Sequence, residues 1–438
     1  MRLVALFSAG LAVLPYAVSA QKSVFAHIVV GNTAAHSVTT WGTDISLAQA
    51  AGIDAFVLNI GLGDTNTPGQ VANAFSAAEA AGSTFKLFFA FDYLGGPSGA
   101  WPATGDFPNS VVSFVNKYKT SPAYFKFNNL PFVSTFEGTG NVNDWAQGGP
   151  IRSGTGGVYF VPDWTSLGPG GITGVSDKID GAFNFDMWPE GAHNKTADVD
   201  KAWQGALGQK SYMMGVSPWF FHSATGFGPN WLWRGDDLWA DSWAQTLDVN
   251  PQFVQIVTWN DYAEATYIGP LHDPSEIAAG SGQYVNNMPH DSWRDFLPYY
   301  IGKFKNSPPA IDRDQMQFWY RLAPASAGST CGVTANNPNQ GQQALPPDAV
   351  LQDGVFFSAL LKADAKVTVQ IGSGPLVSFD GKQGINHWST PFNGNTGAPV
   401  FSIVRDGVTV NSGKGAAIEA NTNLPSGCAN YNAWVGSF

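Results

Sequence analysis

The sequence predicts an α/β protein, a (β/α)8 TIM barrel followed by a C-terminal β-sandwich domain. Three observations predict this architecture. Eight short apolar runs, each ending in a polar residue, recur between residues 24 and 261. Helix-like stretches lie between these runs, and after residue 306 the pattern changes to alternating segments separated by turns. Eight strand–helix units in about 280 residues match the size of such a barrel.

The eight predicted strands are continuous apolar runs, which are typical of parallel strands covered on both faces. Intervening stretches such as "GQVANAFSAAEAAG" have apolar residues at helical spacing and end at glycine. A doubly wound open sheet is the alternative, but the sequence has neither a dinucleotide-binding G-x-G-x-x-G turn nor a P-loop. The strands are expected at 24–32, 55–61, 86–94, 131–138, 157–164, 181–189, 212–220 and 253–261.

The second predicted domain covers residues 307–438. Pro308 and Pro309 break the last helix of the barrel, which is expected to occupy residues 21–306. Beyond them, segments such as "VFFSALL" and "AKVTVQIG" predict the strands of a β-sandwich. A Ser/Thr-rich tether is missing between the two parts, so we expect them to pack together.

Composition excludes some classes of partner. Charged residues are only 13% of the 438, the net charge is −11 and the pI is about 4.9. A nucleic-acid-binding protein would show clustered lysine and arginine, and this sequence has no such cluster. A neutral substrate fits a lightly charged surface better.

The N-terminus predicts secretion. Arg2 precedes an apolar stretch at 3–14, and Val18-Ser19-Ala20 supplies the small residues of a cleavage site. Residues 1–20 are therefore expected to be a signal peptide, with the mature chain starting at Gln21. The stretch is too short to be a membrane anchor, and no later run has about 18 continuous apolar residues. We expect an extracellular or cell-wall protein.

Two cysteines and one sequon fit that location. Cys331 and Cys428 most simply form one disulfide in an oxidising compartment, and two buried free thiols are the alternative. Two cysteines cannot by themselves build a zinc site of the usual kind. Asn194-Lys195-Thr196 is a glycosylation sequon and predicts a surface loop.

Polar and aromatic residues gather where the predicted strands end. The active sites of this barrel class lie at the carboxyl ends of the strands. Carboxylates handle protons and hydroxyl groups, and flat rings pack on the apolar faces of sugars, so this set predicts a sugar-binding cleft. Its members are Asp92, Glu137, Asp163, Asp186, Asp261 and Glu264, with Trp164, Trp188, Trp219 and Trp259 and with Asn32, Asn59 and Asn260.

The turn "WNDYAE" at 259–264 holds two of the carboxyl groups. Hydrolysis of a glycosidic bond needs one carboxylic acid that donates a proton and one carboxylate that activates water or attacks carbon. Asp261 and Glu264 supply both from one turn. The alternative is that Asp261 caps a helix and Glu264 is solvated.

Other chemistries have less support. The sequence contains neither a G-x-S-x-G elbow nor an H-E-x-x-H motif, and its seven histidines are scattered. The segment "LHDPSE" at 271–276 could hold a cation, but a turn is the simpler interpretation. We therefore expect no cofactor and no metal ion in the reaction.

Several motifs together resemble fungal glycoside hydrolase family 71, the endo-α-1,3-glucanases or mutanases. They include "VFAHIVVGN", "KLFFAFDY", "FVPDW", "NFDMWP", "GVSPWFF" and "VTWNDYAEATYIGP", and the resemblance runs from about residue 24 to the C-terminus. It implies a barrel with an attached β-domain and hydrolysis of α-1,3-glucan with inversion. Glu264 would be the general acid and Asp261 the general base, about 6.5–9.5 Å apart.

The resemblance also implies a substrate-binding set and a single partner, the polysaccharide. Each residue of the set could instead hold a loop in place. Many secreted mutanases carry a Ser/Thr/Pro-rich linker and a wall-binding module, and this chain has neither. A monomer is expected. The alternatives are an inactive carbohydrate-binding wall protein and a glycosidase for another α-glucan linkage. The expected substrate-binding residues are Asp92, Glu137, Asp163, Asp186, Trp188, Trp219 and Asn260, with Trp259 and Tyr262 as an apolar wall.

Overall fold

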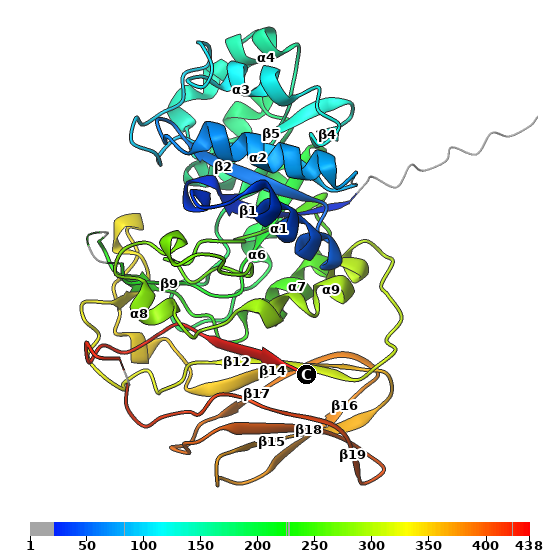
Figure 1. The fold of residues 1–438 in the computed structure, drawn as a ribbon, viewed down its shortest axis with the longest axis vertical. Helices are drawn as coiled ribbons and strands as arrows, with labels where there is room; N and C mark the ends of the chain where they lie inside the picture. The colour runs from blue at the N-terminus through cyan, green and yellow to red at the C-terminus, as the bar shows by residue number, and fades with distance from the viewer. Residues whose placement is uncertain (1–21, 83, 225, 227, 423) are drawn as a thin grey trace, which may run out of the picture.

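The computed structural model describes residues 22–438 except 83, 225, 227 and 423. The expected signal peptide, residues 1–20, lies outside the described residues. Figure 1 shows the N-terminal strands and their helices in the upper part of the molecule and antiparallel sheets of the C-terminal region in the lower part. None of the described helices is long and apolar enough to span a membrane.

All eight predicted parallel strands are present, and they form one curled sheet. Seven of them hydrogen-bond in the order β5-β3-β2-β1-β11-β8-β7, each parallel to its neighbour, and the short β4 (Lys126–Phe127) pairs antiparallel with β5. The strands are β1 (Ser23–Val29), β2 (Ala55–Gly61), β3 (Lys86–Asp92), β5 (Leu130–Phe136), β6 (Tyr159–Phe160), β7 (Gly181–Asn184), β8 (Ser211–Val216) and β11 (Phe253–Ile256).

The two edges of this sheet approach each other around Asp163. The short strand β6 pairs in parallel with β5. Three residues beyond β6, Asp163 forms isolated parallel bridges to Phe136 at the end of β5 and to Phe183 in β7. A single residue of the predicted strand 157–164, just beyond the observed β6, therefore contacts both edges.

Helices cover the outside of the curled sheet. They begin where the sequence supplies caps, since the Ser37 side chain accepts from the Thr40 N–H before α1 and the Ser110 side chain accepts from the Ser113 N–H before α3. Their buried residues face the strands. The main helices are α1 (Val38–Ala50), α2 (Thr67–Ala80), α3 (Val111–Tyr118), α4 (Pro150–Thr155), α6 (Asp198–Leu207), α7 (Leu238–Val249) and α9 (Leu297–Phe304), with short helices α5 (Gly168–Ile172) and α8 (Gly282–Val285).

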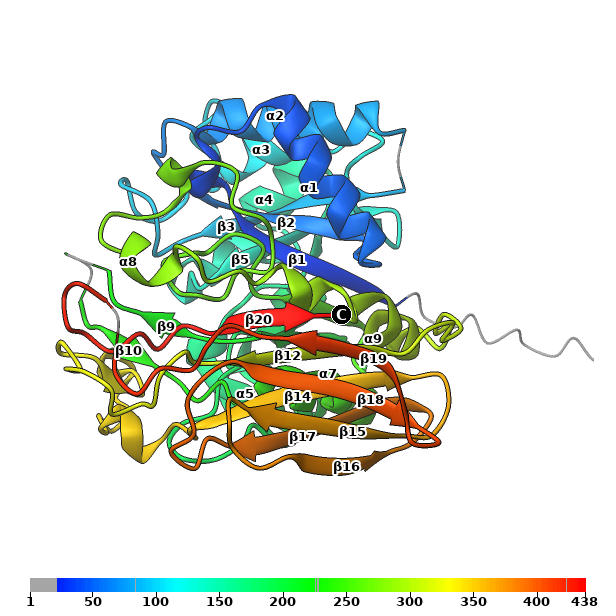
Figure 2. The same cartoon turned by 60° about the horizontal axis from the view of Figure 1, so that its bottom comes forward.

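The C-terminal region contains two four-stranded antiparallel sheets (Figure 2). The first has the order β17-β14-β12-β20 and the second β16-β15-β18-β19. Strands β16, β17 and β19 were not predicted from the sequence. The first sheet comprises β12 (Gln315–Tyr320), β14 (Gly354–Leu361), β17 (Gly384–Pro391) and β20 (Trp434–Ser437); the second comprises β15 (Ala365–Ile371), β16 (Val377–Gly381), β18 (Pro399–Arg405) and β19 (Val408–Lys414).

The first of these sheets is a middle layer. On one face, Phe318 and Phe357 share an apolar cluster with Phe401 of the second sheet. On the other face, Trp319 and Phe356 belong to the large core of the N-terminal part. Strand β14 is accordingly buried at all eight positions, whereas β15 alternates between buried and more exposed residues.

A small sheet connects the C-terminal region to the segment that follows β8, and a disulfide lies within that region. A three-stranded sheet pairs β13 (Thr334–Ala335) with β10 (Trp231–Leu232), which in turn pairs with β9 (Phe221–His222). The disulfide predicted from the sequence is confirmed, because Cys331 and Cys428 are bonded to each other. Residues around 331–345 are therefore held against the segment that follows β8.

Candidate active site

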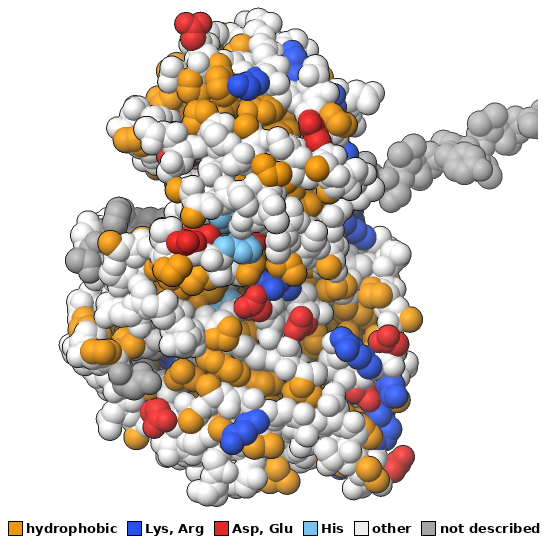
Figure 3. Space-filling model, in the orientation of Figure 1, with side chains coloured by type: hydrophobic (Ala, Val, Ile, Leu, Met, Phe, Trp, Pro, Cys, Tyr) orange, Lys and Arg blue, Asp and Glu red, His pale blue; other side chains and the backbone are white. Residues whose placement is uncertain are grey.

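A cleft with a volume of about 1410 Å³ opens at the carboxyl ends of the parallel strands. The residues that line it follow β3, β5, β6, β7 and β8 and the turn after β11. Five of the residues predicted for the site line this cleft, namely Glu137, Asp163, Asp186, Trp188 and Glu264. Figure 3 shows acidic and histidine side chains gathered where the upper part of the molecule meets the lower, and the face drawn there has no broad basic patch.

The turn after β11 is held rigidly by its own hydrogen bonds. The Thr258 hydroxyl accepts from the Asp261 N–H at 2.8 Å, and the Asp261 carboxylate accepts from the Glu264 N–H at 3.1 Å. The carbonyl of Glu264 accepts from the Phe221 N–H at 2.9 Å, and the Tyr284 hydroxyl donates to the Ala263 carbonyl at 2.6 Å. Asp261 thus caps this turn, and the same geometry places Glu264 beside it.

Asp261 and Glu264 form an interacting carboxyl pair. Their carboxyl groups lie close enough for each to affect the pKa of the other. Burial raises the pKa of Asp261 to about 6, although hydrogen bonds from the turn oppose the shift. Burial and the neighbouring charge of Asp261 raise the pKa of Glu264 well above its ordinary value. Burial thus favours the protonated form of both groups, and the Asp261 charge adds to this effect at Glu264.

A second acidic cluster lies at the ends of β3, β5 and β6. Asp163 is 1% exposed; one oxygen accepts from the Thr165 hydroxyl at 2.6 Å, and the other has no hydrogen-bond partner among the described residues. Burial, with the charges of Glu137 and Asp92 nearby, raises the pKa of Asp163. Glu137 accepts from the Ser166 N–H at 2.9 Å. Asp163 therefore lines the cleft with a carboxyl group whose second oxygen is buried and unpaired among the described residues.

Asp92 and Asp186 differ in their relation to the cleft. Asp92 does not line it; its carboxylate accepts from the Leu94 N–H at 2.9 Å, and burial raises its pKa. Asp186 lines the cleft with a side chain that is 42% exposed and lies 3.6 Å from the ammonium group of Lys195. Asp186 is therefore free to contact a ligand, whereas the carboxylate of Asp92 accepts a hydrogen bond from the backbone of its own loop.

Aromatic rings form one wall of the cleft. The Trp188 and Trp233 rings are stacked, with centroids 5.0 Å apart and planes 6° from parallel. Phe220 packs edge-on against Trp233 at 4.5 Å, and Trp231 also lines the cleft. Trp231 and Trp233 were not among the predicted site residues. The signal was the alternation Trp231-x-Trp233, which places both side chains on one side of an extended segment.

Asn260 and Trp259 have structural partners instead of lining the cleft. The Asn260 side chain accepts from the Val29 N–H at 2.8 Å and donates to the Val29 carbonyl at 3.0 Å. The Trp259 ring is 1% exposed and packs edge-on against Phe56 at 5.0 Å. These two residues fasten the turn after β11 to the neighbouring strands β1 and β2.

Trp219 and Tyr262 are buried as well. The Trp219 indole donates to the Tyr431 carbonyl at 2.9 Å and so links the end of β8 to the C-terminal region. The Tyr262 hydroxyl donates to the Pro270 carbonyl at 2.6 Å and lies 3.4 Å from Glu276. Both residues are 1% exposed and hold segments next to the cleft.

The C-terminal region contributes to the cleft directly. Asn337, Gln340 and Gln342 line it. The side-chain amide oxygen of Gln342 accepts a hydrogen bond from the Trp233 indole at 2.9 Å, so this loop fixes the position of the aromatic wall. Asn194, the residue of the sequon, also lines the cleft; it is exposed and donates to Asp241 at 3.2 Å.

The parallel-sheet cleft, with its carboxyl pair and tryptophan wall, defines the class of protein as a glycoside hydrolase. The family model named Glycosyl hydrolase family 71 matches residues 20–438, and the chain belongs to this family. A glucan endo-1,3-alpha-glucosidase of Schizosaccharomyces pombe is 34% identical, covering 99% of this chain and 98% of the relative. A mutanase of Penicillium rubens is 32% identical, covering 96% and 89%.

One more sequence relative and one solved structure extend the comparison. An ascus wall endo-1,3-alpha-glucanase of Schizosaccharomyces pombe is 25% identical, covering 90% of this chain and 92% of the relative. Among solved structures, a GH99 endo-alpha-mannosidase of Bacteroides thetaiotaomicron aligns with a TM-score of 0.47 and 14% identity, covering 65% of this chain and 97% of that one. The family membership rests on the sequence relatives and not on this weak structural similarity.

Proposed function

We propose that this protein is a secreted, endo-acting glycoside hydrolase that cleaves α-1,3-glucosidic linkages in α-1,3-glucan with inversion at the anomeric carbon, and that it acts as a monomer. Support comes from its family and from relatives named glucan endo-1,3-alpha-glucosidase and mutanase over nearly their full lengths. Further support comes from Glu264, a carboxyl group with a raised pKa that lines the cleft and follows Asp261 in the same turn.

The size of the cleft favours an endo mode of action. Pockets for small ligands usually have about 300–1,000 Å³. The volume of about 1410 Å³ is larger and suits several consecutive sugar units. A chain bound in this way presents internal linkages to the carboxyl pair.

The proposed roles follow from the two protonation states. Glu264, in its protonated form, donates its proton to the glycosidic oxygen as the bond to the anomeric carbon breaks. Asp261, which has the lower pKa, accepts a proton from the water that attacks that carbon. One water is consumed, and the proton that leaves Glu264 is matched by the one that arrives on Asp261.

The distance that inversion requires between the two carboxyl groups leads us to propose a movement of one side chain. Inversion uses groups about 6.5–9.5 Å apart, with a water and the sugar between them. The two carboxyl groups affect each other's pKa, and we propose that they take up this separation when the substrate binds. Asp261 is fixed by the Glu264 N–H at 3.1 Å, whereas Glu264 has a longer and more flexible side chain. We therefore propose that Glu264 swings into the cleft when the substrate binds.

For substrate binding we propose Glu137, Asp163, Asp186 and Trp188, which line the cleft. Trp233 joins them because it stacks on Trp188. The other five predicted residues would affect substrate binding indirectly, through the loops that they hold in place. They are Asp92, Trp219, Trp259, Asn260 and Tyr262.

We also propose a domain division and a closed barrel. Closure of the curled sheet over residues 21–306 is supported by the bridges of Asp163 to both sheet edges. A β-sandwich over residues 307–438 is supported by the apolar cluster shared by the two four-stranded sheets.

The test of the carboxyl pair uses purified protein and soluble α-1,3-glucan oligosaccharides. Asp261→Asn and Glu264→Gln should each reduce kcat by at least about 10³-fold while oligosaccharide affinity stays within a few-fold. Asp312→Asn, an exposed acid outside the cleft, is the matched control and should keep wild-type rates. Near-normal hydrolysis by either site variant would refute the assignment.

Substrate and stereochemistry need a separate experiment. The wild-type protein is incubated with a panel of linkage-defined glucans, and NMR follows the first-formed anomer. α-1,3-Glucan should be cleaved to oligosaccharides whose new end is the β-anomer. Binding without products would favour a wall-binding protein, and cleavage of another α-linkage would identify a different glycosidase.

A further inference from the structure

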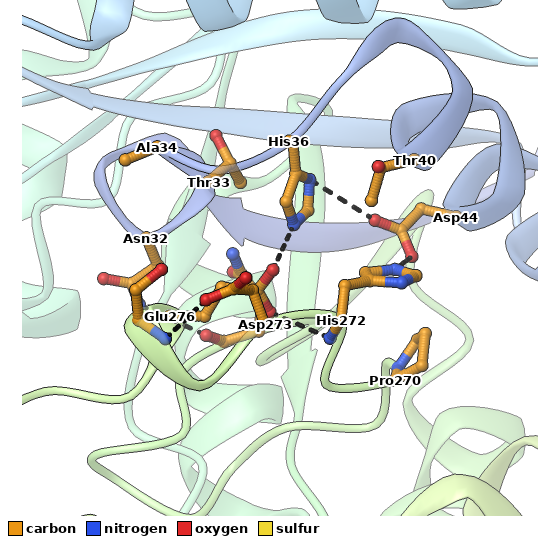
Figure 4. Close-up of polar contacts among 12 residues, drawn as sticks. Asn32, Thr33, Ala34, His36, Thr40, Asp44, Pro270, His272, Asp273 and Glu276 are labelled. Carbon is orange, nitrogen blue, oxygen red and sulfur yellow. Dashed lines mark hydrogen bonds and ion pairs between the residues drawn. The ribbon is translucent and has the colours of Figure 1, made fainter.

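A cluster of histidine and carboxyl side chains lies outside the cleft, on the other side of the turn after β11. His36 comes between the 3-10 turn Val30–Thr33 and α1, and Asp44 lies on the buried face of α1. His272 and Glu276 come from the segment that follows the turn (Figure 4). His36, Asp44 and Glu276 are 5%, 0% and 4% exposed, so the group is built into the interior.

Two hydrogen bonds fix the orientation of the rings. His36 Nε2 lies 2.9 Å from Glu276 Oε1, and His272 Nε2 lies 2.8 Å from Asp44 Oδ1. The other Glu276 oxygen accepts a hydrogen bond from the backbone N–H of His272 at 3.2 Å. An ionised carboxylate only accepts hydrogen bonds, so Nε2 of His36 carries a proton, and in the neutral form of the ring Nδ1 has a lone pair.

Two buried atoms are left facing each other. His36 Nδ1 and Asp44 Oδ2 are 3.8 Å apart, and neither has a hydrogen-bond partner among the described residues. Both are acceptors in this protonation state, so they repel one another unless a positive charge lies between them. Leaving such atoms unpaired in the interior costs stability. The geometry thus leaves a place for a cation.

We propose that His36 Nδ1, Asp44 and His272 bind one divalent transition-metal ion, with Zn²⁺ the best match, as a structural site. Donor atoms of these three residues all lie within 4.8 Å of one another. Ligands at about 2.0–2.2 Å from a tetrahedral zinc ion lie roughly 3.3–3.6 Å apart, so the site needs small shifts of these side chains, and His272 must release the proton of its hydrogen bond to Asp44. A water molecule would be the fourth ligand.

The surrounding groups support this assignment. Glu276 orients His36 through the ring nitrogen that faces away from the ion, the usual carboxylate–histidine–metal arrangement. Imidazole donors favour zinc over calcium or magnesium, which prefer oxygen ligands. A dication also balances the two buried carboxylates of Asp44 and Glu276. His272 is 22% exposed at its side chain and gives the ion a route from solvent.

A proton is the rival occupant. The hydrogen bond to Asp44 raises the pKa of His272, so this ring can be positively charged without a metal. That charge would satisfy Asp44 Oδ1 and leave His36 Nδ1 and Asp44 Oδ2 unpaired, and a proton on His36 Nδ1 would face Asp44 Oδ2 at 3.8 Å, beyond hydrogen-bond range. A metal ion satisfies both.

The site would stabilise the segment that carries the carboxyl pair. Tyr262, between Asp261 and Glu264, contacts Glu276 and donates to the Pro270 carbonyl. The ion would therefore tie α1 and the β1–α1 connection to this segment. None of the four residues of the cluster lines the cleft, so the ion would take no part in bond cleavage.

The experiment measures metal binding by the full-length mature protein. After dialysis against EDTA, titration calorimetry with Zn²⁺ should give one site, and elemental analysis of the reloaded protein should give about one zinc per chain. Zn²⁺ should raise Tm by a few degrees, and equal concentrations of Mg²⁺ or Ca²⁺ should not. Absence of saturable zinc binding, or equal stabilisation by Ca²⁺, would overturn the proposal.

Variants locate the site. His272→Gln, at a partly exposed position, should fold and weaken zinc binding at least about tenfold, and Glu276→Gln should weaken it about 10–100-fold. His387→Gln is the matched control, because His387 pairs with Asp237 at 2.9 Å and with Ser358 at 3.0 Å and so has no free nitrogen. Zinc affinity unchanged in His272→Gln and Glu276→Gln, or reduced equally in His387→Gln, would refute the assignment.

Discussion

At the scale of single residues, the carboxyl pair carries a cost in stability. Burial raises the pKa of Asp261 to about 6, and burial together with the Asp261 charge raises the pKa of Glu264 further. The folded chain therefore binds protons at these sites more tightly than the unfolded chain does. It follows that the pair lowers stability as pH rises from about 4 through 6 and above.

This linkage predicts that Glu264→Gln is more stable than the wild type at pH 7.5. Removing the titrating group should increase the free energy of unfolding by at least about 1 kcal/mol, and the gain should shrink towards zero at pH 4. Urea unfolding at both pH values measures it. Glu419→Gln, an exposed acid, is the control and should show no gain at either pH. A gain independent of pH would contradict this explanation.

The same pair predicts the acid limb of the rate profile. Catalysis needs Asp261 ionised, so kcat/KM should rise with pH through an apparent pKa near 6. It should fall at higher pH when Glu264 loses its proton. Because the two groups interact, both limits belong to the pair. Initial rates between pH 3 and 9 measure them, and an acid limb near pH 4 would contradict the assigned environment of Asp261.

The tryptophan wall gives a further residue-scale prediction. Trp233→Ala should raise KM for oligosaccharides about 3–10-fold, because it removes a ring that packs on sugar and supports Trp188. The value of kcat should change less. Trp388→Ala, in β17 outside the cleft, is the control. A change in kcat with KM unchanged would show that Trp233 acts on the carboxyl pair instead.

At the scale of elements, the turn after β11 depends on its link to β1. Asn260 makes two hydrogen bonds to the backbone of Val29, at 2.8 and 3.0 Å. Asn260→Ala should destabilise the fold by roughly 2 kcal/mol, because it leaves buried backbone groups unpaired. It should lower kcat more than it changes oligosaccharide affinity. A large loss of affinity with kcat intact would restore Asn260 as a direct substrate ligand.

The strands of the N-terminal part were predictable and several later ones were not, for a physical reason. Runs such as "AFVLNIG" are buried on both faces, so their composition alone marks them. Strand β19, "VTVNSGK", is exposed along most of its length, and its pairing with β18 decides its structure. Propensity carries little information about such an edge strand.

Part of the candidate site, like part of the fold, was predictable from the sequence. Strand ends located the acids, because the cleft of a parallel sheet opens there. Sequence could not separate Asp163, which lines the cleft, from Asp92, whose partner is its own loop. It also could not bring His36 and Asp44 next to His272, since their contact depends on how distant segments pack.

At the scale of the whole molecule, the C-terminal region is part of the active enzyme and not an appendage. Gln342 supports Trp233 in the cleft, and Trp319 packs in the core of the N-terminal part. The Trp319 indole also donates to the Asp236 carbonyl at 2.7 Å. We therefore expect residues 21–306 alone to lack a cooperative unfolding transition, and we expect the full chain to unfold in a single one.

A buried cluster of charged residues at the boundary between the N-terminal part and the C-terminal region allows a more specific test of how the two depend on each other. Asp236 is 0% exposed and lies 3.0 Å from Arg234 of the N-terminal part and 3.5 Å from Arg321 of the C-terminal region. Burial raises the pKa of Asp236, and the arginines oppose that shift. Removing one arginine leaves the carboxylate undercompensated, a change that typically costs about 3–5 kcal/mol.

Arg321→Ala should therefore lower Tm by several degrees and raise KM, because the loop that supports Trp233 loosens with the boundary. Arg405→Ala is the matched control. Arg405 pairs with Asp314 at 2.9 Å, but its side chain is 20% exposed and the pair lies within the C-terminal sheets. That variant should cost less than about 1 kcal/mol and leave KM unchanged. Equal losses in both variants, or a lower Tm in Arg321→Ala with wild-type KM, would show that the C-terminal region stabilises the enzyme without shaping its cleft.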